Sequence, residues 1–254
     1  MLKGLIVSLF LLLSIPGMTV AAEIELRDVI DALETPFKAE TKNSEQIKDF
    51  SATFFQESHI ASIDRTQHGQ GVVQFKFTAA TGQKSPLAKF RWEYHKPTVQ
   101  EIISDGQTMW VYLPENRQVI ESDIGQIDAQ KGENPVTFLS GLGNLSQDFF
   151  INWGSPRIVE SGDYLLQLEP HKASQFIQKI EVTVSKKSVN NWLKGDKTGE
   201  IFPIIATLVT DPNGNLTAIE FRDVQVNRKL ADNLFQFERP EGVELVDPAE
   251  QMSF

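Results

Sequence analysis

Apolar and polar side chains alternate along residues 90–119, and this period of two is typical of β-strands. In FRWEY (residues 90–94), three aromatic side chains fall on one face of the expected strand and the charged side chains on the other. Asp105-Gly106 predicts a chain reversal, and Trp110-Val111-Tyr112 then repeats the aromatic spacing. The pattern predicts neighbouring strands that present one broad aromatic face.

Two segments have helical rather than strand periodicity. Between residues 24 and 50 the apolar positions recur nearer to every 3.6 residues, so we expect one or two helices with a break at Pro36. Residues 138–145 show the same spacing after Asn134-Pro135, a typical helix start. Two glycines weaken this second helix, which suits a movable cover as well as an ordinary loop junction.

Most of the remaining chain is predicted to form strands. We expect them at residues 51–58, 71–77, 164–168, 176–184, 204–209, 216–221 and 234–237. Residues 186–200 interrupt this run as a polar excursion, in which Trp192 and Leu193 either pin the loop to the body or contact a partner. Without a repeat or a low-complexity linker, the pattern favours a single, mostly antiparallel domain over residues 23–254.

Residues 1–22 have the features of a secretory signal peptide. Lys3 precedes an apolar run over residues 5–13, and Val20-Ala21-Ala22 provides small residues for cleavage. An uncleaved N-terminal anchor is the alternative interpretation, although this run is shorter than the roughly 20 residues that span a bilayer. We therefore expect an exported protein.

Composition narrows the function classes. The chain has no cysteine, which excludes disulfides, thiolate metal sites and a lipid-modified N-terminus. Removing Lys3 with the signal peptide leaves 23 basic and 34 acidic groups, so the formal charge changes from −10 to −11. An acidic chain without a basic run is a poor ligand for nucleic acid or anionic lipid headgroups.

Catalytic and metal-binding patterns are weak. The four histidines are scattered, and the chain has neither a G-x-S-x-G elbow nor a phosphate-binding loop. Asp211, Asn213 and Asn215 have the spacing that opens a calcium loop, but Leu216 replaces the required glycine, so a hairpin turn is favoured. No carboxylate pair stands out. The sequence predicts no catalytic residue, cofactor or metal ion.

Six motifs occur in order along nearly the whole chain after residue 22. They are F-x-W at Phe90–Trp92, P-x-x-Q-x-I-x-S-D-G ending at Gly106, W-x-Y-x-P at Trp110–Pro114, N-P-x-x-x-L-x-G at Asn134–Gly141, D-x-x-G-N at Asp211–Asn215 and F-x-x-P-x-G-V-E at Phe237–Glu244. In this set the chain resembles the periplasmic outer-membrane lipoprotein carrier proteins of the LolA type.

The resemblance implies a mainly β (α+β) fold, an incompletely closed antiparallel β-barrel with an α-helical lid over an apolar cavity. It also implies a monomeric, non-enzymatic periplasmic chaperone without a cofactor. Such a carrier takes triacylated lipoproteins from an inner-membrane ABC lipoprotein-releasing transporter and passes them to an outer-membrane receptor. Because the receptor is itself a lipoprotein, a chain without cysteine resembles the carrier.

The resemblance assigns Phe90 to the acyl-facing aromatic of F-x-W and residues 138–142 to the covering helix. With the strand pattern, it gives the predicted lipid-binding set: Phe75, Phe90, Trp92, Ile103, Trp110, Tyr112, Phe138, Leu139 and Leu142. An acyl chain of about sixteen carbons costs on the order of 10 kcal/mol to expose to water, so a shielded concavity has a physical purpose. If Phe90 faces a cavity, Phe90→Glu is expected to weaken loading with little loss of folding.

Two features depart from the family pattern. Ser85 stands before Pro86 where well-studied members have a basic residue that helps to hold the lid closed, and residues 186–200 look longer than usual. Three other interpretations stay open: the aromatics are ordinary core packing, the same fold is a lipid-sensing or regulatory module, or the chain is a secreted hydrolase with an unrecognised carboxylate site.

Overall fold

The computed structural model describes residues 23–38, 40–42, 44–77, 88–124, 138–196 and 199–246. The predicted signal peptide, the predicted helix start at Asn134-Pro135 and the Ser85-Pro86 dipeptide lie outside these residues.

The described strands form one twelve-stranded sheet with the order β12-β6-β5-β4-β3-β2-β1-β11-β10-β9-β8-β7. Their bounds are β1 Asp49–Ile60, β2 Arg65–Phe77, β3 Ala88–Lys96, β4 Gln100–Ser104, β5 Thr108–Leu113, β6 Gln118–Asp123, β7 Phe149–Ile158, β8 Tyr164–Pro170, β9 Lys179–Val184, β10 Ile204–Thr210, β11 Leu216–Val226 and β12 Glu244–Val246. Neighbours are antiparallel except β12 and β6. Because β12 and β7 end the sheet without pairing to each other, the barrel is incompletely closed, which confirms the predicted fold class.

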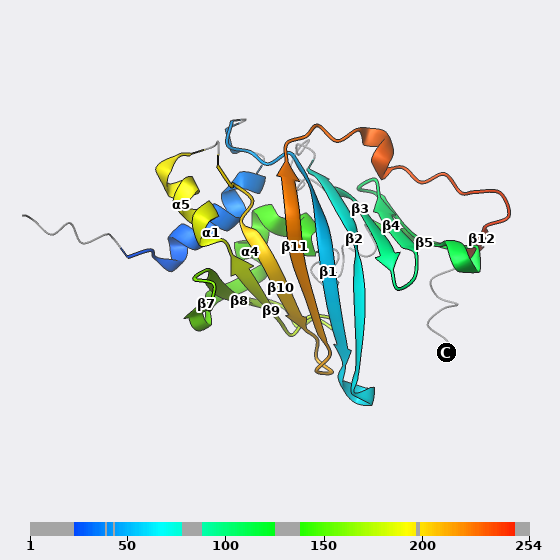
Figure 1. Cartoon of the computed structure of the whole chain (residues 1–254), viewed down its shortest axis with the longest axis horizontal. Helices are drawn as coiled ribbons and strands as arrows, with labels where there is room; N and C mark the ends of the chain where they lie inside the picture. Colours follow the sequence, from blue (N-terminus) through cyan, green and yellow to red (C-terminus); the bar gives the residue numbers. More distant parts are fainter. Residues whose placement is uncertain are drawn as a thin grey trace, which may run out of the picture.

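Helices gather on one side of this sheet, where α1, α4 and α5 lie close together (Figure 1). The helical elements are α1 Leu26–Glu34, η1 Thr35–Phe37, η2 Ala61–Ile63, η3 Pro114–Asn116, η5 Leu139–Asn144, α4 Leu145–Asp148, α5 Lys186–Lys194 and η6 Asp232–Phe235. Helix α1 contacts both α5 and η5. No helix of the described residues has the length and apolar character needed to cross a bilayer.

Helix α1 forms because its apolar residues fall on one face. Val29, Ala32 and Leu33 are buried, and the side chains of Glu25 and Asp28 cap its first turn. Pro36 lies in the short 3₁₀ helix η1 that follows, so the predicted break is confirmed.

The predicted polar excursion at residues 186–200 contains helix α5. The Ser185 side chain accepts a hydrogen bond from the Ser188 backbone amide at the N-terminus, and Gly195 closes the C-terminus with φ 69°. Trp192 packs against the core, whereas Leu193 is exposed. The excursion is thus held to the body through Trp192.

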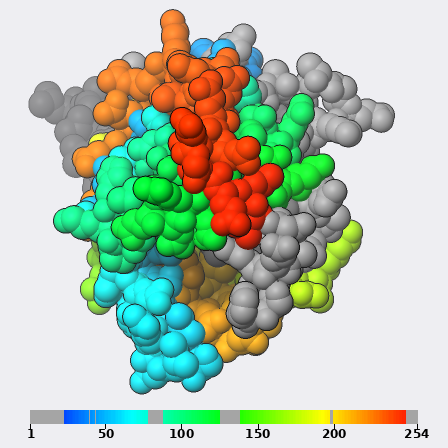
Figure 2. Space-filling view, turned by 90° about the vertical axis from the view of Figure 1, so that its right-hand side faces the viewer, coloured from blue at the N-terminus to red at the C-terminus, as the bar shows by residue number. Residues whose placement is uncertain are grey.

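The C-terminal segment, residues 227–246, leaves β11 and runs along the molecule to β12 (Figure 1). The predicted strand at residues 234–237 is wrong, because η6 occupies Asp232–Phe235 and contacts β3 instead of extending a sheet edge. Figure 2 shows β12 lying over the β5–β6 region and a hollow between the β1–β2 hairpin and the gold strand β10.

Candidate functional site

Six of the nine predicted site residues meet on the helix-covered face of the sheet, here called the inner face. Strand pairing sets Phe75 opposite Phe90, with Trp92 opposite Val73 on the same face. Phe138, Leu139 and Leu142 from the covering segment join the same apolar cluster. None of the six is more than 3% exposed.

Aromatic rings line the inner face across four neighbouring strands. The centroid of Phe75 lies 5.5 Å from that of Phe90, and the Trp92 centroid lies 4.8 Å from that of Phe54 on β1. The ring of Phe50 stacks on Phe75 at 5.1 Å with 9° between the planes. Such rigid rings form a wide apolar surface.

The predicted set missed several aromatic residues of this face, among them Phe50, Phe54, Phe202 and Phe221. Alternation in residues 49–54 and the predicted strand at 216–221 were available as signals for three of them. Phe202 lies outside any strand and reaches the cluster through Phe50, with 4.6 Å between the ring centroids. No periodicity marks that position.

The covering segment, residues 138–148, is fastened to α1 and η1. The Glu34 carboxylate accepts a hydrogen bond from the Ser146 backbone amide and lies 3.1 Å from the Lys38 ammonium group. A Cβ at Gly143 would lie 3.0 Å from the Phe37 carbonyl oxygen, so glycine permits the close approach of η5 to η1. The covering segment is therefore in contact with α1 through Glu34 and with η1 through Phe37.

The prediction that Ile103, Trp110 and Tyr112 share this face is wrong. Ile103 pairs with Arg91 and with Trp110, whereas Trp92 pairs with Ile102, so the three residues lie on the outer face. The length of the turn explains this difference. Four residues separate the paired Ser104 and Met109, and because four is an even number, the even-numbered residues of β4 share a face with the odd-numbered residues of β5.

The outer-face residues are covered by the C-terminal segment. The Phe237 ring centroid lies 6.1 Å from that of Trp110 and 5.4 Å from that of Tyr112. Trp110 Nε1 donates to Glu121 at 3.0 Å, and Arg91 donates to the Leu234 carbonyl at 3.3 Å. The contacts of Phe237 and Leu234 hold the C-terminal segment against the outer face, whereas the bond from Trp110 to Glu121 joins β5 to β6.

Lys89 also belongs to the outer face. Its ammonium group lies 3.0 Å from the Asp232 carboxylate, which Lys76 approaches at 3.2 Å. Both lysines hold the pKa of Asp232 below its ordinary value. Although Lys89 is close in sequence to the position of the family's locking residue, it fastens η6 and not the inner cover.

Tyr94 ends the aromatic row on β3 and stays uncharged. Burial raises its pKa to about 12, and its hydroxyl donates to Gln56 Oε1 at 2.9 Å. Trp92 Nε1 is buried and has no hydrogen-bond partner among the described residues. The inner face at this position is thus apolar and neutral at physiological pH.

The raised pKa of Tyr94 predicts a loss of stability in alkali. The free energy of unfolding should be unaffected by Tyr94 below pH 10 and should then fall by up to about 3 kcal/mol towards pH 12, because the folded state resists its ionisation. Urea unfolding at pH 8 and near pH 12 measures the change. The Tyr94→Phe variant should show a smaller difference between the two pH values, and an equal difference would contradict the assignment.

The structure does not bring the other candidate residues together as a metal-binding site in the part of the chain that it describes. No group of three or more histidine or acidic side chains in the described ranges is arranged to hold a metal ion. Asp211 forms the predicted turn between β10 and β11, where its Oδ1 accepts hydrogen bonds from the backbone amides of Asn213 and Asn215. Burial acts to raise the pKa of Asp211, but the hydrogen bonds from Asn215 and Asn213 together lower it.

The family model and the relatives that match this chain carry the same description. Residues 45–238 match the model of the family described as outer membrane lipoprotein carrier protein LolA. An outer-membrane lipoprotein carrier protein from Methylobacillus flagellatus is 26% identical over 219 residues, covering 86% of this chain and 95% of the relative. One from Hahella chejuensis is 26% identical over 239 residues, covering 94% and 97%.

Two solved structures are also similar at low identity. An uncharacterized conserved protein from Thermus thermophilus gives a TM-score of 0.46 at 14% identity, covering 87% of this chain and 98% of the other. A LolA superfamily protein from Nitrosomonas europaea gives 0.42 at 14% identity, covering 85% and 99%.

Proposed function

Because the chain belongs to the LolA family of outer membrane lipoprotein carrier proteins, we propose that it shields the acyl chains of lipoproteins and shuttles them across the periplasm. It takes them from an inner-membrane ABC lipoprotein-releasing transporter and delivers them to an outer-membrane receptor. It acts as a monomer, by binding alone and without catalysis.

One observation supports this proposal most directly. Six of the side chains predicted from the sequence to bind lipid lie together on a single apolar face beneath helices. They come from β2, β3 and the covering segment. An acyl chain placed there loses its contact with water, and burial contributes about 0.8 kcal/mol for each methylene. We assign acyl binding to Phe75, Phe90, Trp92, Phe138, Leu139 and Leu142, and leave Ile103, Trp110 and Tyr112 outside the site.

Loading requires the cover to move. The six side chains are almost completely buried by one another and by the helices, so an acyl chain reaches them only when residues 138–148 separate from the sheet. The cover consists of short helical turns, η5 and α4, and is joined to α1 through the bond from Ser146 to Glu34. Replacing the contacts of the cover by contacts with an acyl chain keeps the apolar face dry in both states.

The test is extraction of a synthetic triacylated lipopeptide from phospholipid vesicles by the purified protein. We expect the lipopeptide to appear in the soluble fraction as a stoichiometric complex and to pass on to acceptor vesicles that carry a higher-affinity receptor. The same peptide without acyl chains is the control and should not bind. Lipopeptide that stays in the vesicles at every protein concentration, or that is hydrolysed, would refute the carrier function.

A further inference from the structure

The indole nitrogen of Trp92 is an unused hydrogen-bond donor on the inner face. Trp92 is 0% exposed, and its Nε1 is one of the few buried side-chain nitrogen and oxygen atoms that have no hydrogen-bond partner among the described residues. A buried N–H group without an acceptor is unfavourable, because it has lost its bond to water and gained none in return. Such an atom at a binding site is suited to a ligand that brings an acceptor.

Aromatic rings surround the Trp92 side chain. The ring of Phe54 lies 4.8 Å away between centroids, with 71° between the planes, and the rings of Phe75 and Phe221 lie at 6.2 and 6.4 Å. The face of an aromatic ring is only a weak acceptor for an N–H group. An oxygen atom of a bound molecule is therefore a stronger partner for Nε1 than any of these rings.

The polar groups next to Trp92 along the inner face do have partners. The Tyr94 hydroxyl donates to Gln56 Oε1 at 2.9 Å, and Gln56 Nε2 donates to Ser58 Oγ at 3.0 Å. On β1 the inner face thus changes from the buried ring of Phe54 to the polar Gln56 and Ser58 towards the β1–β2 hairpin. This end of the inner face, with Tyr94, Gln56 and Ser58, is here called the polar end.

The covering segment lies at the opposite end of the same row. Its Gly143 approaches the Phe37 backbone, and the Phe37 ring lies 5.1 Å from the ring of Phe77, which pairs with Ala88 at the start of β3. Trp92 is therefore placed between the covered end of β3 and the polar end. Figure 2 shows the hollow between the β1–β2 hairpin and β10 on the side of the polar end.

We infer that Trp92 Nε1 donates a hydrogen bond to an ester carbonyl oxygen of the diacylglyceryl group of the lipoprotein. The hydrocarbon tails then lie towards Phe90 beneath the cover, and the glyceryl group and the peptide lie towards Tyr94 and Gln56. The inference rests on the proposed carrier function and deepens it. It assigns recognition of the ester linkage to one residue and gives the direction in which the lipid is held.

The ester group needs such a donor as much as Trp92 needs an acceptor. An ester carbonyl that moves from water to an apolar face loses its hydrogen bonds unless the protein replaces them. The Tyr94 hydroxyl already donates to Gln56, so Trp92 Nε1 is the donor that remains in this row. A site with a buried, fixed donor discriminates against an analogue that lacks the acceptor. We therefore expect selectivity for ester-linked over ether-linked chains of equal length.

The test compares a triacylated lipopeptide with its counterpart whose glyceryl chains are attached by ether bonds. The full protein extracts each from phospholipid vesicles, and the wild type should bind the ester lipopeptide at least about fivefold more tightly. Trp92→Phe should lose this ratio. The matched control is Trp110→Phe, which removes an indole N–H from the outer face and should keep the ratio.

Nuclear magnetic resonance reports on the hydrogen bond directly. In the ¹⁵N-labelled protein, the indole N–H proton signal that disappears in Trp92→Phe should move downfield when the ester lipopeptide binds and should not do so with the ether lipopeptide. The indole signal of Trp110 should respond to neither, because its N–H donates to Glu121.

Equal wild-type affinities for the two lipopeptides, or a ratio that persists in Trp92→Phe, would overturn the inference. Should Trp92→Phe fail to fold, replacing Trp92 by benzothienylalanine keeps the shape of the ring system and puts sulfur in place of the N–H group. The ester-to-ether ratio of the wild type decides independently of both variants. Extraction of neither lipopeptide would reject the carrier function together with this inference, whereas equal extraction of both would reject this inference alone.

Discussion

Phe90→Glu is expected to abolish loading of a triacylated lipopeptide and to lower the free energy of unfolding by about 3–5 kcal/mol. The sequence predicts only the first effect, since a cavity-lining residue tolerates a charge when water enters. In the structure Phe90 is 1% exposed and packs on Phe75, so a glutamate there loses both its water and the ring contact. Vesicle extraction and urea unfolding measure the two effects.

Tyr112→Glu is the matched control for this variant. Both changes put a carboxylate in place of an aromatic ring in a neighbouring part of the sheet, but Tyr112 lies on the outer face, is partly exposed and contacts Phe237. It should keep normal loading and lose about 1 kcal/mol of stability or less. Loading is expressed per folded molecule. Normal loading by Phe90→Glu, or loss of loading by folded Tyr112→Glu, would show that the acyl-binding site does not lie on the inner face.

Strands were predictable from the sequence because their signal is local. In residues 90–94 the alternation of aromatic and charged side chains defines two faces without reference to any other part of the chain, and β3 has those faces. The break of α1 at Pro36 is similarly local, since proline lacks the amide that a helix needs. The order of the family motifs extends this information to the whole sheet.

Which strand faces coincide was not predictable. A reversal at Asp105-Gly106 is visible in the sequence, but the number of residues that it takes up is not. Five residues separate the paired Tyr94 and Gln100, and four separate Ser104 and Met109, so only the second turn exchanges odd and even positions. This single difference moves Trp110 and Tyr112 away from Phe90.

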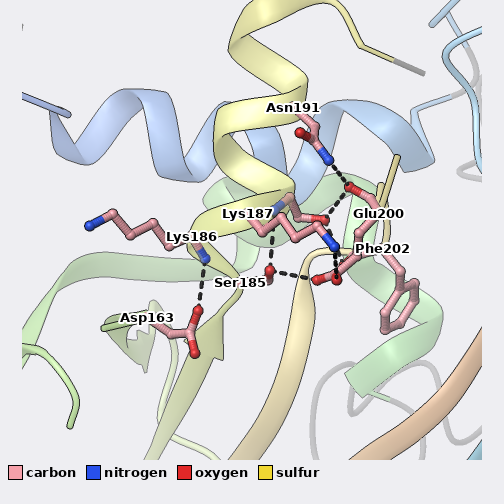
Figure 3. A network of polar contacts seen from close by, with 8 residues as sticks. Asp163, Ser185, Lys186, Lys187, Asn191, Glu200 and Phe202 are labelled. Atoms are coloured by element: carbon pink, nitrogen blue, oxygen red, sulfur yellow. Dashed lines mark hydrogen bonds and ion pairs between the residues drawn. The ribbon is translucent and has the colours of Figure 1, made fainter. Parts of the chain in front are cut away.

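Helix α5 was missed for a different reason. Its residues are mostly polar. Besides the local cap at Ser185, its stability comes from tertiary contacts, namely the packing of Trp192 and the hydrogen bonds of Ser188 and Asn191 to the chain at Glu200 and Phe202 (Figure 3). Phe202 was missed with it, because residues 199–203, which precede β10, show no hydrophobic periodicity. Helix α5 lies within residues 186–200, where this chain looks longer than its family, and Phe202 follows directly after them. None of the six motifs covers either part.

Gly71→Ala is expected to have the largest effect on stability of any methyl-sized change in β2. A Cβ at Gly71 would lie 1.7 Å from the Glu93 carbonyl oxygen and 3.0 Å from Tyr94 Cα, and both are backbone atoms of β3 that cannot rotate away. The two strands must separate at the bulge beside Gln70, so the free energy of unfolding should fall by at least about 3 kcal/mol. Chemical denaturation measures the loss.

The same glycine determines how the inner face is built. Gly71 pairs with Phe54 on one side and Tyr94 on the other, and without a side chain between them their ring centroids approach to 4.9 Å across β2. Gly69→Ala is the matched control, since its Cβ would meet only the Tyr94 ring at 3.3 Å and Gln56 Cβ at 3.8 Å. It should cost about 1 kcal/mol or less, because a ring can shift where a backbone cannot. Equal losses in the two variants would show that close backbone approach does not set the geometry of the aromatic row.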